Sequence, residues 1–202
     1  MKLFFSIAIA TLVNCAIAQS YEFSIYGGYT FGDRFPVNGG RGKVYESGTY
    51  GGSLSFVQNE NFSIDLIFTQ QDTRGTLRVP FLGINIDEDI AVNYILAGGS
   101  KLIPLNKQTQ LYSGLKIGTV IISSKRDVFS NITRFAAGFN GGIKFLFTDM
   151  IGFKAQANIA LPITDVGGYL WWSPSQGTNI GLTSNTPIVQ IGFLGGIFIR
   201  LQ

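Results

Sequence analysis

The sequence predicts an all-β fold, an antiparallel up-and-down transmembrane β-barrel of about eight strands. Apolar and polar residues alternate with a period of two along most of the chain, which is typical of strands whose two faces meet different surroundings. Hydrophobic residues make up 46% of the 202 residues and charged residues only 13%. After the N-terminal segment, no apolar stretch is long enough for a transmembrane helix. Such a chain is either a soluble protein with a large core or a membrane barrel.

Residues 1–18 have the features of a cleavable signal peptide. Lys2 provides a positive start, Leu3 to Val13 form an apolar run, and Ala16-Ile17-Ala18 supplies the small residues that precede a cleavage site. The apolar run is too short to span a bilayer as a helix. We expect cleavage after Ala18, which divides the chain into a signal peptide, 1–18, and a barrel domain, 19–202.

Cys15 is the only cysteine and lies inside this segment. It is either removed with the signal peptide or kept as a lipoprotein cysteine. Asn14 favours removal, because a small residue usually precedes a lipidated cysteine. Removal leaves no thiol and no disulfide. Without Lys2 the basic residues fall from 15 to 14 against 12 acids, a net charge of about +2. No basic stretch is dense enough to indicate nucleic-acid binding.

Eight strands follow from the alternation. We expect them near residues 21–31, 49–56, 62–69, 89–101, 110–121, 134–147, 151–161 and 189–201. The apolar faces of the first four carry Tyr21, Phe23, Ile25, Tyr29 and Phe31, then Tyr50, Leu54 and Phe56, then Phe62, Ile64, Leu66 and Phe68, then Ile90, Val92, Tyr94 and Leu96. Those of the last four carry Leu111, Leu115, Ile117 and Ile121, then Phe135, Phe139, Ile143, Phe145 and Phe147, then Ile151, Phe153, Ile159 and Leu161, then Val189, Ile191, Phe193, Ile197, Ile199 and Leu201.

The connections between these strands alternate in length. Short turns lie at 58–61, 104–107 and 148–150, and long loops are expected at 32–47, 72–88, 123–131 and 163–187. This is the plan of an outer-membrane barrel with short periplasmic turns and long extracellular loops. Glycine pairs recur in the strands, and we interpret them as sites where a small barrel bends sharply.

The two faces indicate that the apolar side points outward, into lipid. An eight-stranded barrel has an interior just wide enough for side chains to fill it, so the large apolar residues do not fit inside. A charge facing mid-bilayer lipid costs about 2–4 kcal/mol for Arg or Lys. The charges fall on the opposite face and predict an interior network of Glu22, Asp65, Lys116, Arg134, Lys144, Lys154 and Arg200.

This network has two interpretations. It is either a salt-bridged plug or, because five of its seven members are basic, a thin and weakly anion-selective water path. Closure of the barrel pairs the first strand with the last, and we expect Glu22 and Arg200 to meet inside it near the periplasmic end.

The C-terminal stretch, residues 193–202, is similar to the closing strand of outer-membrane proteins, although Gln202 replaces the usual final aromatic residue. With residues 64–73 and 135–144, it makes the mature chain resemble the outer membrane protein β-barrel domain group. That group includes OmpA/OmpX-like barrels and the PorT-like barrels common in Bacteroidota. The resemblance implies insertion into the bacterial outer membrane by the barrel-assembly machinery, and implies no particular activity.

The residues offer little catalytic chemistry. The chain has no histidine, and known outer-membrane barrel enzymes use histidine as acid or base. We therefore expect no enzyme activity, no metal site and no cofactor. The acidic run Asp87-Glu88-Asp89 is either a solvated loop that enters a strand, or a site that holds a divalent cation or bridges to lipopolysaccharide.

Two further groups could contact a partner. Arg34, Arg41 and Lys43 in the first long loop could contact anionic lipid headgroups, or could simply be solvated. Tyr169, Trp171 and Trp172 form either part of an aromatic belt or a contact patch for a protein partner or an apolar ligand.

The leading expectation is therefore a non-enzymatic outer-membrane barrel with a structural or interaction role. The alternatives are a narrow channel or transporter for small solutes or apolar molecules, and a soluble secreted ligand-binding barrel.

Overall fold

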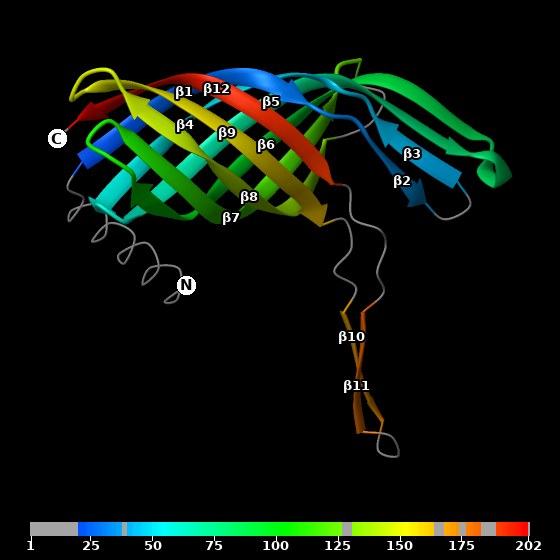
Figure 1. The fold of residues 1–202 in the computed structure, drawn as a ribbon. Helices are drawn as coiled ribbons and strands as arrows, with labels where there is room; N and C mark the ends of the chain where they lie inside the picture. Colours follow the sequence, from blue (N-terminus) through cyan, green and yellow to red (C-terminus); the bar gives the residue numbers. More distant parts are fainter. Residues whose placement is uncertain are drawn as a thin grey trace.

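Eight antiparallel strands close into a barrel in the computed structural model, which describes residues 20–37, 40–126, 131–163, 168–173, 177–182 and 189–201. The strands follow one another around the ring in chain order, and β12 pairs with β1 to close it (Figure 1). They are β1 (Ser20–Thr30), β4 (Ser47–Asn59), β5 (Phe62–Val79), β6 (Ile84–Pro104), β7 (Thr109–Ser124), β8 (Ile132–Leu146), β9 (Ile151–Ile163) and β12 (Gln190–Leu201). The predicted fold class and strand number are confirmed.

An exposed apolar belt surrounds this barrel. From Ser20 to Gly27 of β1 the residues alternate between buried and exposed, and Phe23 and Ile25 are 53% and 58% exposed. Leu115 on β7 is 72% exposed. Surface this apolar is unfavourable in water and fits the hydrocarbon layer of a membrane, where a closed barrel leaves no backbone group unpaired. Among the described residues, no helix is long and apolar enough to cross a membrane.

The two ends of the barrel differ. We call the end where β1 begins and β12 finishes the inner end, since Tyr21 pairs there with Leu201. Its connections are short, as predicted. The opposite, outer end carries the longer connections, and a three-residue 3₁₀ turn, η1 (Pro80–Leu82), joins β5 to β6 there.

The face predicted for β6 is wrong. Ile90, Val92, Tyr94 and Leu96 point into the barrel and are buried, whereas Ile95 on the other face is 44% exposed. Both faces of this strand are apolar, so alternation alone does not fix which one meets lipid. The interior apolar residues decide the outcome, because the β6 residues pack there with Tyr26, Ile67, Val120, Ala136 and Leu194.

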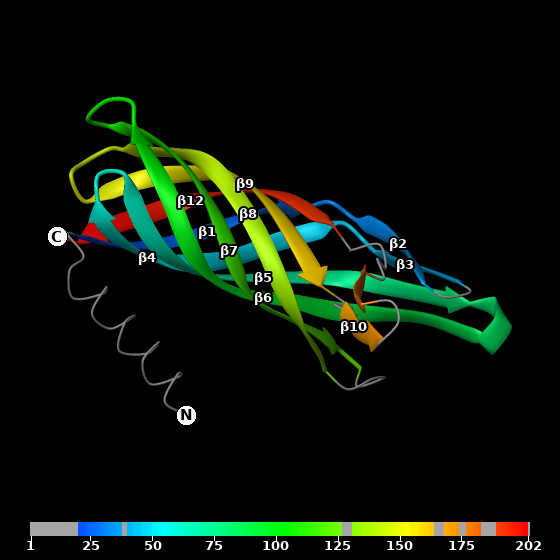
Figure 2. The ribbon, with the colours of Figure 1, turned by 90° about the horizontal axis from the view of Figure 1, so that it is seen from below.

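Two predicted loops are largely β-structure. Residues 72–88 continue β5 and β6 beyond the belt, and the segment 32–47 contains β2 (Asp33–Val37) and β3 (Gly40–Val44). β3 pairs with β5, so the four strands form a sheet that projects from the outer end (Figures 1 and 2). Sequence patterns missed these strands because Asp33, Pro36, Gly40 and Gly42 are residue types that are uncommon in strands. We call this projecting sheet, with residues 70–79 and 84–93 of β5 and β6, the outer extension.

A second small sheet forms within the last long connection. β10 (Gly168–Ser173) and β11 (Gly177–Leu182) form a separate two-stranded sheet within the described part of the chain. Tyr169, Trp171 and Trp172 belong to β10, but their side chains lie outside the described part of the structure, as do residues 1–19 with the predicted signal peptide and Cys15.

Candidate functional site inside the barrel

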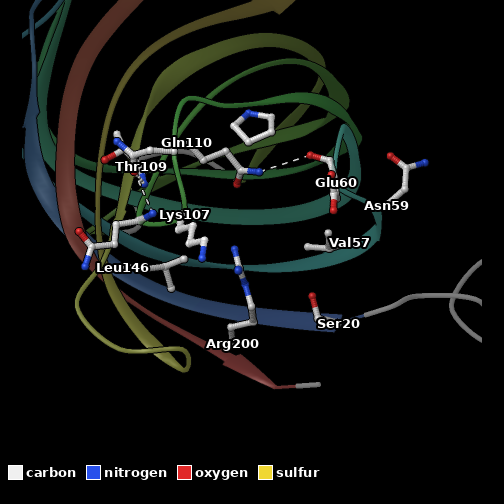
Figure 3. A pocket seen from close by; sticks show the side chains of 12 residues that line it. Ser20, Val57, Asn59, Glu60, Lys107, Thr109, Gln110, Leu146 and Arg200 are labelled. Carbon is white, nitrogen blue, oxygen red and sulfur yellow. Dashed lines mark hydrogen bonds between the residues drawn. The ribbon is translucent and has the colours of Figure 1, made fainter.

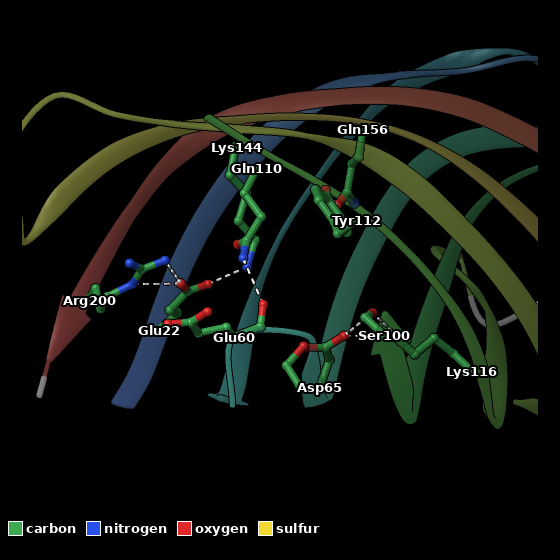
Figure 4. A network of polar contacts seen from close by, with 11 residues as sticks. Glu22, Glu60, Asp65, Ser100, Gln110, Tyr112, Lys116, Lys144, Gln156 and Arg200 are labelled. Carbon is green, nitrogen blue, oxygen red and sulfur yellow. Dashed lines mark hydrogen bonds and ion pairs between the residues drawn. The ribbon is translucent and has the colours of Figure 1, made fainter. Parts of the chain in front are cut away.

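A carboxylate near the inner end is held by two cations. Glu22 on β1 is 1% exposed, and Arg200 on β12 donates to its Oε1 from Nε at 2.9 Å and from Nη2 at 2.7 Å. The pairing register places these two residues directly opposite each other on neighbouring strands. Lys144 reaches the other oxygen, Oε2, from β8 on a different part of the wall (Figure 4). Glu22 therefore ties the closing seam of the barrel to β8 through its interior.

A second carboxylate, Asp65, lies on β5, two strands from β1 around the ring. Lys116 Nζ on β7 is 2.8 Å from Asp65 Oδ2 on β5, and both residues are buried. Ser63 and Ser100 donate hydrogen bonds to the two oxygens of Asp65, at 3.0 and 2.5 Å. A buried ion pair is favourable only where further hydrogen bonds satisfy its remaining polar atoms, and the two serines do so here.

Gly98 makes the contact between Asp65 and Lys116 possible. In the register of β5, β6 and β7, Gly98 lies directly between Asp65 and Lys116. A side chain at this position would stand between the two charges. A Cβ at Gly98 would also lie 2.1 Å from the carbonyl oxygen of Leu115, so the strands approach too closely for any residue but glycine.

Lys154 is the third buried lysine and has a different environment. It lies on β9 directly opposite Lys144 on β8, yet no described carboxylate is within salt-bridge distance of it. Its Nζ lies 4.9 Å from the ring centroid of Tyr112 and 6.0 Å from that of Tyr26. The aromatic faces stabilise the cation only in part, because a cation–π contact contributes about 0.5–2 kcal/mol.

The interior network thus holds four cations and two carboxylates among the described residues. The structure brings together six of the seven predicted members: Glu22, Asp65, Lys116, Lys144, Lys154 and Arg200. The seventh, Arg134, was placed wrongly. Its side chain is exposed towards the outer end of β8 and donates to the Thr133 carbonyl at 3.0 Å. Arg134 has the parity of the interior face but lies beyond the part of the strand that the barrel encloses.

The barrel contains a large cavity on the inner side of the network and is packed with side chains on the outer side. At the inner end lies a cavity of about 500 Å³ that is lined by Arg200, Lys107, Gln110 and Glu60 among others (Figure 3). Towards the outer end, the apolar cluster of Tyr26, Ile67, the β6 residues and their neighbours fills the lumen. Two small cavities of about 50 and 40 Å³ lie among the described residues there. The described lumen is therefore filled in its outer part.

The network contains one pair that resembles a nucleophile and its base. Lys116 Nζ is 2.7 Å from Ser100 Oγ. Lys116 is also paired with Asp65, however, and Ser100 is 1% exposed and does not line the inner cavity. The pair consequently belongs to the buried ion network. No group of three or more metal-ligating side chains occurs among the described residues.

The acidic run at 87–89 is used within the outer extension. Asp87 pairs with Arg74 and Asp89 with Arg126, while the buried Glu88 accepts hydrogen bonds from Ser124 and the backbone of residue 126. These contacts join β5, β6 and the end of β7.

These features define the chain as a small β-barrel of the outer-membrane type. Comparison with solved structures supports this class, although no protein-family model and no curated protein sequence matches the chain. Neisserial surface protein A is similar over 89% of this chain and 97% of its own, with 12% identity and a TM-score of 0.57. The outer membrane protein OprG from Pseudomonas aeruginosa is similar over 92% of this chain and 97% of its own, with 11% identity and a TM-score of 0.59. At these identities the likeness is one of fold.

Proposed function

We propose that this chain is an integral outer-membrane barrel with a non-enzymatic interaction role, carried by its outer extension. The observation that carries the proposal is the contrast between a filled lumen and an ordered sheet that projects outside it. The inner end would face the periplasm and the outer end the cell exterior.

The filled lumen argues against a transport role. A solute entering from the inner cavity meets Glu22 and its two cations, and beyond them the apolar cluster. Small cavities of about 50 and 40 Å³ hold one or a few water molecules at most. The proposed role therefore lies at the surface of the barrel.

Two measurements test this proposal. In native membranes, the protein should resist carbonate extraction, and chemical crosslinking should capture a reproducible partner through residues 33–44 or 70–93. In planar bilayers, the purified full-length protein should give no steps of conductance. Release by carbonate would contradict the membrane location, and the soluble-barrel alternative would then hold.

A narrow anion path is the second candidate, and Lys154 favours it. With this buried lysine, the described interior has four cations against two carboxylates, as in a weakly anion-selective pore. Conductance that prefers chloride and falls in Lys154→Met would support the channel and overturn the interaction role as the main one. Lys101→Met is the matched control, since Lys101 is exposed on the outward face of β6.

A further inference from the structure

The outward face of the outer extension carries four basic residues in one cluster. Arg34 on β2 lies directly opposite Lys43 on β3, and Arg41 on β3 lies directly opposite Arg78 on β5. Residues directly opposite each other, and residues two apart on one strand, share a face of the sheet. We call these four residues the basic face. Arg34, Arg41 and Arg78 are exposed and Lys43 is half-buried.

The arrangement opposes like charges. Like charges directly opposite each other destabilise a sheet, and the basic face contains two such pairs side by side. The outward-facing acids of β5 and β6 already have other partners: Asp87 pairs with Arg74, Asp72 with Lys125 and Asp89 with Arg126. Among the described residues, none of the four cations has a carboxylate within salt-bridge distance.

The basic face continues the lipid-facing side of the barrel. On β5 the outward residues are Phe62, Ile64, Leu66 and Phe68 within the belt, and then Gln70, Asp72, Arg74, Thr76 and Arg78 beyond it. Arg34 follows only three residues after Phe31, which belongs to the exposed apolar belt and packs on Phe193. The four cations therefore lie beyond the apolar belt, on the same side of the sheet as the lipid-facing residues. The headgroups of the outer leaflet would lie next to this side.

We propose that the basic face binds phosphate groups of the glycolipid headgroups that surround the barrel in the outer leaflet. Guanidinium groups match phosphate oxygens through paired hydrogen bonds, and three of the four cations are arginines. A phosphate between Arg41 and Arg78 would turn a repulsive pair into two favourable contacts. This inference rests on the proposed membrane location but not on the interaction role with a protein partner.

The test uses the full-length protein folded in phosphatidylcholine nanodiscs. The discs contain a small fraction of deep-rough lipopolysaccharide in one sample and of the same glycolipid, enzymatically dephosphorylated, in the other. Native mass spectrometry counts the glycolipids that remain on the protein after release from the disc. We expect retention of the phosphorylated form, and loss of that retention by about tenfold or more when all four residues are changed to Gln.

Two further variants show whether retention of the glycolipid depends on paired hydrogen bonds and on the position of the charges. Arg41→Lys with Arg78→Lys keeps the charge but loses the paired hydrogen bonds, so retention should be intermediate. Arg134→Gln with Arg126→Gln removes charge at the same end of the barrel, outside the basic face, and should retain the glycolipid as the unchanged protein does. A shift in gel mobility on heating verifies that each variant is folded.

Three results would overturn the proposal. One is equal retention of the phosphorylated and dephosphorylated glycolipids. Another is unchanged retention in the four-residue variant. The third is displacement of the glycolipid by a soluble sulfated polysaccharide that also binds in discs without glycolipid, which would make a soluble polyanion the ligand. Failure of the membrane location would appear separately, as release of the protein by carbonate.

Discussion

Lys144 and Lys154 lie directly opposite each other on β8 and β9, but only Lys144 reaches a carboxylate. The two lysines have the same chemistry and similar burial, so their different partners predict different effects of substitution.

Lys144→Met should destabilise the barrel. Removing one partner of a buried ion pair leaves a charge uncompensated, which typically costs about 3–5 kcal/mol, and the remaining contact to Arg200 should keep the loss near the lower value. Lys154→Met should leave the free energy of unfolding equal or higher, because it removes a cation without a carboxylate. Urea unfolding in lipid vesicles measures both. A larger loss in Lys154→Met than in Lys144→Met would show that the assignment of partners is wrong.

Charge reversal tests the closing seam. Glu22→Lys should prevent or strongly weaken folding, since it places a third cation beside Lys144 and Arg200. Adding Arg200→Glu should restore folding only in part, because Lys144 still repels the cation introduced at position 22. The fraction of folded protein, followed by gel mobility, distinguishes these outcomes. A double variant no better than Glu22→Lys alone would rule out an energetic role for the Glu22–Arg200 contact.

Gly98→Ala should be one of the most damaging small substitutions in the barrel. The added Cβ would meet the backbone of Leu115 at 2.1 Å, and it would separate Asp65 from Lys116. Overpacking alone costs about 1–3 kcal/mol, and a rigid strand backbone cannot move aside easily. Gly27→Ala is the control, since its Cβ would have only an ordinary contact at 3.8 Å. Equal unfolding free energies for the two variants would contradict the close approach of β6 and β7.

The orientation of β6 can be measured directly. Single cysteines in place of Ile95 or Ala97 should react with a lipid-soluble maleimide in vesicles, because these residues face outward. Cysteines in place of Tyr94 or Leu96 should not react, because these residues are buried inside the barrel. The opposite pattern of reactivity would show that Tyr94 and Leu96 face the lipid, as the alternation of the sequence predicts.

The sequence predicts the ring well and its outer end poorly, for physical reasons. Strands with one apolar and one polar face, such as β1, have only one orientation that satisfies both lipid and lumen. The register at Glu22 and Arg200 follows from closing the ring. β6 is apolar on both faces, so its orientation depends on packing inside the barrel. The burial of Lys116 is likewise predicted by its face, whereas the exposure of Arg134 depends on how far along its strand the barrel encloses it.

The projecting strands of the outer extension are hidden from sequence for another reason. β2 and β3 contain Asp33, Pro36 and two glycines, which are uncommon in strands, and β3 is stabilised by pairing with β5, a segment distant in the chain. Local patterns contain no information about such a partner. For the same reason the basic face emerges only in the structure, which adds Arg78 to the three residues noticed in the sequence.

The ladder between β5 and β6 is unbroken, and each residue of β5 from Phe62 to Val79 has a partner on β6. The strand pair therefore continues without interruption from the part within the apolar belt to the outer extension. The height and direction of the outer extension above the lipid are thus set by the barrel wall itself. A force applied at the exposed Phe81 would therefore pass along the same two strands that carry Asp65 and Gly98.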